Sequence, residues 1–444
     1  MKSSTRATMM VIVVVLFACA VFLQAKIDPE RHQFEPKLAN VNSAVAQLPI
    51  EFALGAATGF REAIAGLLWV RTDEFFHSGN YDAIVPMVRI ITWLDPHNID
   101  VYETGAWHMD YNFTDADQRS DRRYIPLSLS LLKEGIANNP TDSSLFADLA
   151  FTHYMRKVED YPLAVYWYAQ GEKLRAAQGD SWNITTVGHG LAHAYEACGQ
   201  IDNAIAQWKT VIAEHEHRLA DVGSDYAETN SLHIAERNLN EIELRRKHRA
   251  IDTKPPLDAD FDVTATRIAP MIFVISGHAH FIGSQHYVLE TGEHTWTVGD
   301  GTRIELRLQD YNYKFPENQP FTLNANIDPH ATIMQDTVSV EEGTFHKRID
   351  MSRDHLGADP MYSFTAPKYT LTCWFNPASY FDNPPNVQDR TGWLGEGMTD
   401  KRYLDTSGIV PGTPGDKIDG LRMLKKTFVL TRDDIMGSGL KVFH

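Results

Sequence analysis

Residues 191–208 read LAHAYEACGQIDNAIAQW, and this stretch decides the fold expected for the first half of the chain. Its apolar side chains recur three and four positions apart, which is the spacing of one face of an α-helix. The same spacing continues from about Ala56 to Arg249, with few β-rich runs. The sequence therefore predicts that this region consists of helices.

The 191–208 stretch also resembles the tetratricopeptide repeat, a unit of about 34 residues that folds into two antiparallel helices. The residues that carry the resemblance are Leu191, Ala192, Tyr195, Gly199, Ala204 and Trp208. The resemblance implies that the two alanines lie where helices cross closely, that the two aromatic side chains pack beside them, and that Gly199 forms the turn.

Three weaker units precede this one, and about one extra residue stands at the turn of the third. Their matching residues are Phe75, Gly79-Asn80-Tyr81 and Pro96 in the first, Tyr102, Gly105-Ala106, Met109, Ser128, Leu132, Gly135 and Asn139-Pro140 in the second, and Phe146, Leu149-Ala150, Asp160-Tyr161, Ala164 and Tyr168 in the third. Pro86 departs from the pattern. A capping helix from Tyr226 to Arg249 is expected to cover the last unit. The alternative is a helical bundle without repeats.

The resemblance also implies a binding surface, because partners of such repeats usually bind the surface lined by the first helix of each unit. Carrying those positions over gives Asp73, Trp107, Asp110, Tyr154, His193 and Glu196. Their mixture of polar and aromatic side chains suits the binding of a peptide or a helix. The alternative is that they only coat a solvated surface.

The N-terminus has the pattern of a secretory or anchoring segment. Lys2 and Arg6 precede an apolar run from Met9 to Leu23, which is somewhat shorter than the roughly 20 residues that span a bilayer. We expect residues 1–26 to be either a retained membrane anchor or a signal peptide cleaved after Ala25, with lipidation at Cys19 as a third alternative. Residues 27–55 then lead into the helical domain, 56–250. The bulk of the chain is expected in the cell envelope, on the membrane or in the periplasm.

Composition excludes several classes of protein. The 444 residues suit two domains, and the net charge of -17 argues against a nucleic-acid partner, which needs a positive surface. The three cysteines, Cys19, Cys198 and Cys373, form no disulfide framework and no metal-binding pair.

A second domain of strands is expected after a linker at 251–262, which contains Lys254-Pro255-Pro256. From residue 263 to 444 the period changes to two, and several short strands suggest a β-sandwich. The expected strands are Met271–Ser276, Phe281–Leu289, Thr295–Val298, Thr302–Leu308, Phe321–Ala325, Thr337–Val340, Tyr369–Phe375 and Thr427–Thr431. Gly299-Asp300-Gly301 predicts a hairpin between the third and fourth of these. Residues 376–421 are expected to form a long loop.

Two features of this second domain could carry chemistry. His278 and His280 lie two apart on an expected strand and could present two imidazoles to one metal ion, although two ligands do not make a site. In the loop, Arg390 and Trp393 are residue types that dominate protein interfaces. We find no nucleophile elbow, zinc-protease motif or dinucleotide fingerprint, and we expect no cofactor.

Together these patterns predict a multidomain α + β protein of the bacterial envelope that acts as a non-catalytic scaffold. Its expected partners are other envelope proteins or peptides, with the membrane as a further contact if the N-terminal segment is retained. The alternative function is a metal-dependent or carbohydrate-binding protein that uses His278 and His280 of the β domain.

Overall fold

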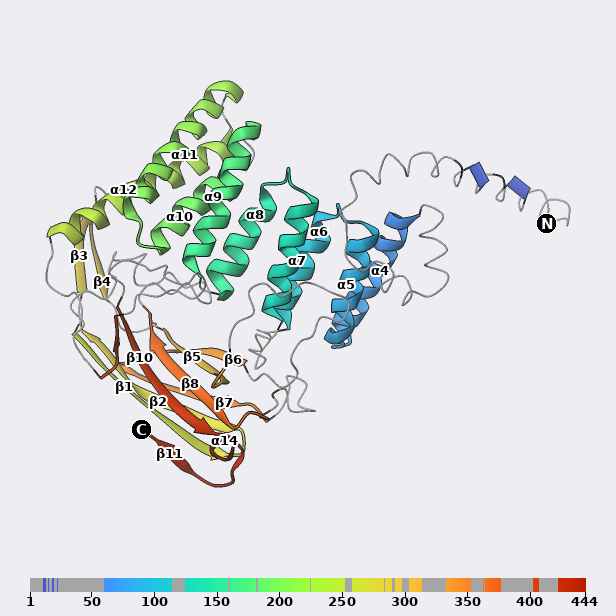
Figure 1. Cartoon of the computed structure of the whole chain (residues 1–444). Coiled ribbons are helices and arrows are strands. Elements are labelled where there is room, and N and C mark those ends of the chain that lie inside the picture. The colour runs from blue at the N-terminus through green and yellow to red at the C-terminus, as the bar shows by residue number, and fades with distance from the viewer. Residues whose placement is uncertain are drawn as a thin grey trace. The chain divides into compact units, whose positions relative to one another are not determined.

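The computed structural model describes residues 60–113, 124–158, 160–180, 183–223, 225–251, 258–282, 284–289, 292–297, 303–313, 333–352, 362, 364–376, 402–406 and 422–444, with isolated positions between 11 and 22. Helices occupy this part of the chain up to Ile251 and antiparallel sheets follow, which confirms the expected order (Figure 1). Within these ranges no helix is long and apolar enough to cross a membrane, and most of the run from Met9 to Leu23 lies outside them.

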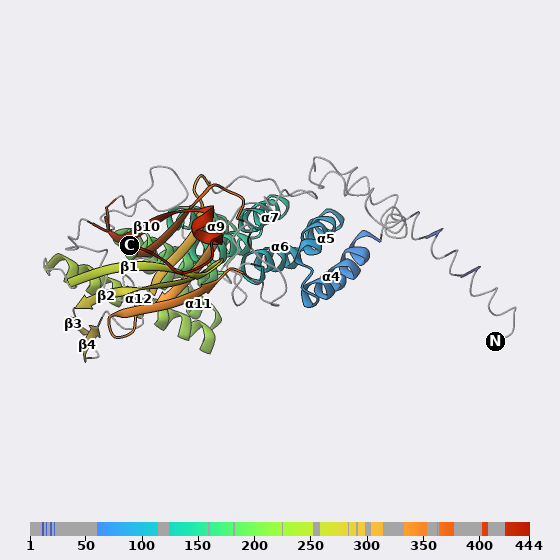
Figure 2. The same cartoon turned by 90° about the horizontal axis from the view of Figure 1, so that it is seen from below.

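The helical region alternates α-helices with short π-helical segments. In both views α4 and α5 lie side by side as a hairpin (Figure 1, Figure 2). The elements are α4 (Arg61–His77), α5 (Tyr81–Leu94), α6 (Ile99–Trp107), η1 (His108–Asn112), α7 (Ile125–Asn138), α8 (Ser144–Asp148), η2 (Leu149–Val158), α9 (Tyr161–Gln178), η3 (Ile184–His189), α10 (Gly190–Ala197), α11 (Ile201–Val222) and α12 (Tyr226–Ile251). Pro86 lies in the second turn of α5, and that helix ends just before Pro96.

Two helical hairpins, α4–α5 and α10–α11, close through the same kind of turn. In each turn a glycine adopts a positive φ, 74° at Gly79 and 67° at Gly199. The next amide donates to the carbonyl five residues back, over 3.0 Å in the first turn and 2.9 Å in the second. A side chain would strain the backbone at these φ values, so the turn favours glycine.

The π-helical segments lie in the first helix of three successive hairpins. In a π-helix each amide bonds to the carbonyl five residues back, so the turn holds one more residue than an α-helical turn. η2 lies in the unit whose sequence has an extra residue before its second helix. There the amide of Asp160 reaches the carbonyl of Tyr154, six residues back, at 2.9 Å. The wider winding therefore takes up the extra residue.

The last hairpin packs through the small residues that the sequence places in it. Ala192 on α10 and Ala204 on α11 have no exposed surface, and Trp208 is equally buried beside them. α12 joins the same hydrophobic cluster through Ala235 and Ile242. It therefore covers the apolar side of α11, in the place expected for a capping helix.

The strands form two larger antiparallel sheets and one small one. Their orders are β11-β1-β2-β7, β6-β5-β8-β10-β9 and β3-β4. Alternate residues of both larger sheets, such as Phe261 and Val263 on β1 and Ile304, Leu306 and Leu308 on β5, are buried in one hydrophobic cluster. The elements are β1 (Asp258–Ala269), β2 (Ile272–Ile282), β3 (Ser284–Leu289), β4 (Gly292–Thr297), β5 (Arg303–Asp310), β6 (Ile333–Ser339), β7 (Thr344–Asp350), β8 (Lys368–Phe375), β9 (Leu404–Asp405), β10 (Met423–Thr431), α14 (Arg432–Met436) and β11 (Lys441–Phe443).

The pairing of the strands corrects two expectations. The hairpin between Thr295–Val298 and Thr302–Leu308 is wrong, because β4 pairs with β3 while β5 pairs with β6 and β8. β5 is therefore an inner strand of its sheet, and a local turn signal does not report partners that lie far away in sequence. In addition, β1 begins at Asp258, inside the stretch expected to be a linker. Lys254-Pro255-Pro256, Phe321–Ala325 and most of the loop at 376–421 lie outside the described residues.

Candidate functional site

The positions carried over from the repeat family fall into two groups by exposure. Three are at the surface and three are buried. The exposed side chains are Asp73, Trp107, which is 44% exposed, and His193, and the buried ones are Asp110, Tyr154 and Glu196, which are 0%, 1% and 2% exposed. A buried side chain reaches a partner only through its neighbours, so direct contact by the second group stays a prediction. Arg390 and Trp393 lie outside the described residues.

A row of aromatic and cationic side chains begins at the exposed Trp107 and continues through partly buried neighbours. We define the Trp107 patch as Trp107 at the end of α6, Tyr111 on η1, and Phe151 and Arg156 on η2. The rings of Trp107 and Tyr111 stack with centroids 6.1 Å apart. The guanidinium of Arg156 lies 5.9 Å from the Tyr111 centroid and 5.6 Å from that of Phe151. Two successive hairpins thus contribute to one surface.

A buried ion pair lies on the same two π-helical segments as the patch. The side chains of Asp110 on η1 and His153 on η2 are both 0% exposed, and Asp110 Oδ2 contacts His153 Nδ1 directly. His153 Nε2 lies 3.5 Å from Asp148 Oδ2. The hydroxyl of Tyr111 also donates to the carbonyl of Thr152 at 2.8 Å. These contacts fix η1 against η2, and with them the Trp107 patch.

The imidazole of His153 keeps its positive charge although it is buried. Desolvation opposes the cation, but the Coulombic attraction of Asp110 and hydrogen bonds to Asp110 and Asp148 outweigh it and raise the pKa of His153 to about 10. For Asp148, burial favours the neutral form, but the hydrogen bond and charge of His153 and a hydrogen bond from Thr152 together outweigh it and lower the pKa of that carboxyl. His153 is therefore cationic at neutral pH.

The same histidine lies 3.0 Å from Ser128 Oγ through Nδ1, which raises the question of a nucleophilic serine. A catalytic base needs an unprotonated nitrogen to take the proton of the hydroxyl. Nδ1 already contacts Asp110, and a cationic imidazole has no free lone pair. Ser128 is also fully buried. Asp110 and His153 therefore form a structural ion pair beside the Ser128 hydroxyl, and the three residues do not form a catalytic triad.

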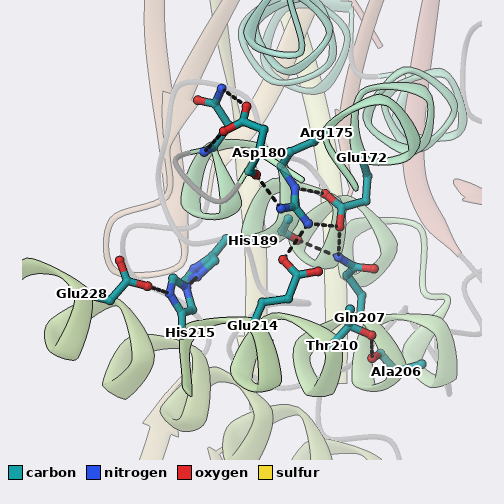
Figure 3. A network of polar contacts seen from close by, with 12 residues as sticks. Glu172, Arg175, Asp180, His189, Ala206, Gln207, Thr210, Glu214, His215 and Glu228 are labelled. Atoms are coloured by element: carbon teal, nitrogen blue, oxygen red, sulfur yellow. Dashed lines mark hydrogen bonds and ion pairs between the residues drawn. The ribbon is translucent and has the colours of Figure 1, made fainter. Parts of the chain in front are cut away.

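A second polar network links α9, η3, α11 and α12 (Figure 3). Arg175 on α9, only 3% exposed, donates to Glu172 at 2.7 and 2.8 Å and to Glu214 on α11 at 2.7 Å. It also donates to the carbonyl of Asp180 at 2.8 Å. Burial opposes its charge, but the hydrogen bonds and charges of Glu172 and Glu214 together outweigh it and raise the pKa of Arg175. The network fastens α9 to α11.

A histidine pair continues this network toward α12. Nε2 of His189 and Nε2 of His215 are 2.9 Å apart, and Nδ1 of His215 is 2.5 Å from Glu228 Oε1 (Figure 3). A carboxylate only accepts, so His215 donates to Glu228 through Nδ1. The hydrogen bond between the two Nε2 atoms then needs one proton, which one of the two rings donates to the other. Burial, with the charges of His215 and His193, lowers the pKa of His189 to about 3, so it is neutral at physiological pH.

Glu196 belongs to this interior, and the partly exposed His193 lies at its edge. Trp208 donates through its indole nitrogen to Glu196 at 2.7 Å, and the ring of His193 stands edge-on to Trp208 with centroids 4.9 Å apart. Glu196 therefore satisfies a buried indole. Although histidines and carboxylates gather here, no group of three or more among the described residues could hold a metal ion.

The tetratricopeptide resemblance rests on the residues alone. No protein-family model, curated protein or solved structure matches the chain. Its function is therefore inferred from the side chains that the fold brings together.

In the strand region, His278 lies opposite Asp262 in the β1–β2 register. Asp262 accepts a hydrogen bond from Tyr403 at 2.7 Å, and although burial favours its neutral form, this bond lowers the pKa of the carboxyl. The side chain of His280 lies outside the described residues. No metal-holding group forms around His278 within the described ranges, so the two-histidine metal site stays a prediction.

Proposed function

We propose that the chain is a non-catalytic interaction scaffold of a bacterial cell envelope. Its helices would form a tetratricopeptide-like solenoid that binds partner proteins, its two larger sheets a β-sandwich, and its N-terminal apolar run a signal or anchor. The matching turns at Gly79 and Gly199 and the buried Ala192 and Ala204 support the solenoid. The cluster shared by both sheets supports the sandwich.

The Trp107 patch is the single observation that carries the binding role. Tryptophan, tyrosine and arginine are the residue types most enriched among the side chains that dominate interface energies. Here they come from two hairpins and are fixed by the buried Asp110–His153 pair, so little conformational entropy is lost when a partner binds. The planar guanidinium of Arg156, placed against two rings, suits a carboxylate. The patch therefore fits a protein segment that carries an acidic side chain beside an apolar one.

Capture of partners from detergent-solubilised membranes tests this function. The wild-type chain should retain specific proteins, and Trp107→Ala and Arg156→Ala should each weaken their binding about 30-fold, the effect of losing about 2 kcal/mol at a central contact. Tyr166→Ala is the matched control, because Tyr166 on α9 is a 52% exposed aromatic residue outside the patch. No retained protein, or equal loss in all three variants, would contradict the proposal.

A further inference from the structure

Strands β1 and β2 set two aspartates of one strand against two histidines of the other. In their antiparallel register Asp262 lies opposite His278, and Asp260 lies opposite His280. Residues two apart on a strand share a face, and directly opposite residues of paired strands share it too. All four positions therefore lie on one face of the sheet, whereas Phe261, between the two aspartates, is buried in the core on the other face.

The register adds two carboxylates to the two imidazoles. Opposite residues of an antiparallel pair have Cβ atoms about 4.5 to 5.5 Å apart, and residues two apart on a strand are separated by about 6.7 Å. Side chains at the corners of such a rectangle can reach one ion that binds about 2.0 to 2.2 Å from each nitrogen or oxygen. Imidazole nitrogen combined with carboxylate oxygen suits zinc. We propose that Asp260, Asp262, His278 and His280 bind one Zn²⁺ ion on the outer face of the β1–β2 pair.

The backbone register places Asp260 and His280, whose side chains lie outside the described residues. The side chains of Asp262 and His278 are described, and both are partly exposed, so an ion can reach them from solvent. The site lies in the strand region, apart from the Trp107 patch, and does not depend on the proposed function.

Asp262 is held in the manner of a metal-ligating carboxylate. Its Oδ1 accepts a hydrogen bond from the hydroxyl of Tyr403 at 2.7 Å and another from the amide of Val263 at 2.9 Å. Its Oδ2 accepts no hydrogen bond from the described residues, so this atom is left for an ion. Tyr403 is held in turn by Phe261, with the two rings edge-on and their centroids 5.6 Å apart. Outer hydrogen bonds of this kind orient the ligands of metal sites.

The aspartates are unfavourable residues for a strand unless a cation accompanies them. Aspartate is depleted in strands, and Asp258, Asp260 and Asp262 alternate along β1, which brings like charges onto one face. A second explanation is that the charges keep the edge of β1 from pairing with other chains, since β11 pairs only with residues 265–267 in the described part of the sheet. That explanation needs no histidines opposite the carboxylates, and it predicts no zinc binding.

Isothermal titration calorimetry of the full chain with Zn²⁺ tests the proposal. The chain is purified in detergent without a histidine tag and is stripped of metal with a chelator. The wild type should bind one zinc ion per chain. His278→Asn, His280→Asn and Asp262→Asn should each weaken this binding more than about 100-fold, because each removes a ligand. Asparagine at position 262 still accepts the hydrogen bond from Tyr403, so the local contacts of the strand are kept.

Tyr403→Phe and His217→Asn are the matched controls. Tyr403→Phe keeps the ring but removes the hydroxyl that orients Asp262, so it should weaken zinc binding about tenfold. His217 on α11 is 79% exposed and lies 3.2 Å from a carboxylate oxygen of Asp221, so it offers zinc a histidine and an aspartate at the surface without the cross-strand arrangement. His217→Asn should leave zinc binding unchanged.

X-ray absorption of the zinc-loaded wild type is a second measurement, which needs no variant to fold. It should show two imidazole nitrogens and carboxylate oxygen at about 2.0 to 2.2 Å. A wild type that binds no zinc would overturn the proposal, and so would zinc bound without two imidazoles. Binding that survives all three ligand variants, or that is lost in His217→Asn, would also overturn it, because other surface histidines would then hold the ion.

Discussion

Asp110→Ala should lower the free energy of unfolding of the helical region by about 3 to 5 kcal/mol, the usual cost of removing one partner of a buried ion pair. The reason is that His153 would lose its counter-charge in a site where both side chains are 0% exposed, and would have to stay buried as an unpaired cation or give up its proton. Chemical unfolding followed by circular dichroism measures this change, because the helices dominate that signal. His153→Ala should cost a similar amount, since it leaves Asp110 buried without its partner.

The double variant and a neighbouring carboxylate are the controls for this prediction. Asp110→Ala with His153→Ala should cost clearly less than the sum of the single changes, because neither charge is then left alone. Asp148→Ala should cost at most about 1 kcal/mol, since Asp148 is 23% exposed and 3.5 Å from His153. Additive single changes, or an equal loss at Asp148, would show that no buried pair holds η1 to η2.

The pH dependence of stability has a definite sign at this pair. The pKa of His153 is raised from 6.5 to about 10 in the folded state, so the folded chain binds the extra proton more tightly than the unfolded chain. Its contribution is therefore fully present below about pH 6.5 and is lost as the pH rises through about 10. His153→Ala should remove this alkaline decline from the unfolding curve. A decline of unchanged size in the variant would contradict the assignment.

Gly277→Ala should destabilise the strand region by about 3 kcal/mol, at the upper end of the usual cost of overpacking. A Cβ at Gly277 on β2 would lie 2.1 Å from the carbonyl oxygen of Asp262 on β1 and 2.6 Å from the ring of Phe345 on β7. The ring could shift, but the carbonyl belongs to the backbone of the paired strand and could not. The two strands would have to separate at this point. Hydrogen exchange of the β1 and β2 amides measures the effect.

Ser276→Ala on the same strand is the matched control for Gly277→Ala. Ser276 neighbours Gly277 and points to the opposite face of the sheet, as successive residues of a strand do. It should change the protection of the amides little. Equal protection in both variants would show that β1 does not pass Gly277 as closely as the register places it. Strand packing therefore accounts for the glycine that precedes His278, without reference to a metal.

The sequence could predict those features that depend on local spacing. Ala192, Ala204 and Trp208 are buried because their separations place them on the faces where neighbouring helices meet. The alternation of Ile304 and Leu306 likewise predicts the face of β5 that joins the hydrophobic cluster, although Glu305 on the other face is also buried. β1 escaped prediction because Asp258 to Asp262 includes three aspartates, which are uncommon in strands, although it pairs with the next strand, β2, along its length.

The candidate site was predictable only in part, for a related reason. Trp107 and Tyr111 stand four apart and meet on one face wherever a helix forms. The contact of Asp110 with His153 joins residues 43 apart in sequence, on two segments whose π-helical winding changes the direction of every side chain that follows. The position of Arg156 over Tyr111 depends on that winding. No spacing rule could therefore have placed Arg156 beside Tyr111.

Photo-cross-linking from position 107 tests the binding role most directly. A photoreactive phenylalanine analogue is placed at Trp107 in one chain and at Tyr166 in another, and both are irradiated in intact membranes. We predict discrete protein adducts from position 107 that disappear when Arg156→Ala is added, and few or none from position 166. Adducts that are absent at 107, or equal in number and identity at the two positions, would contradict a partner-binding surface at the Trp107 patch.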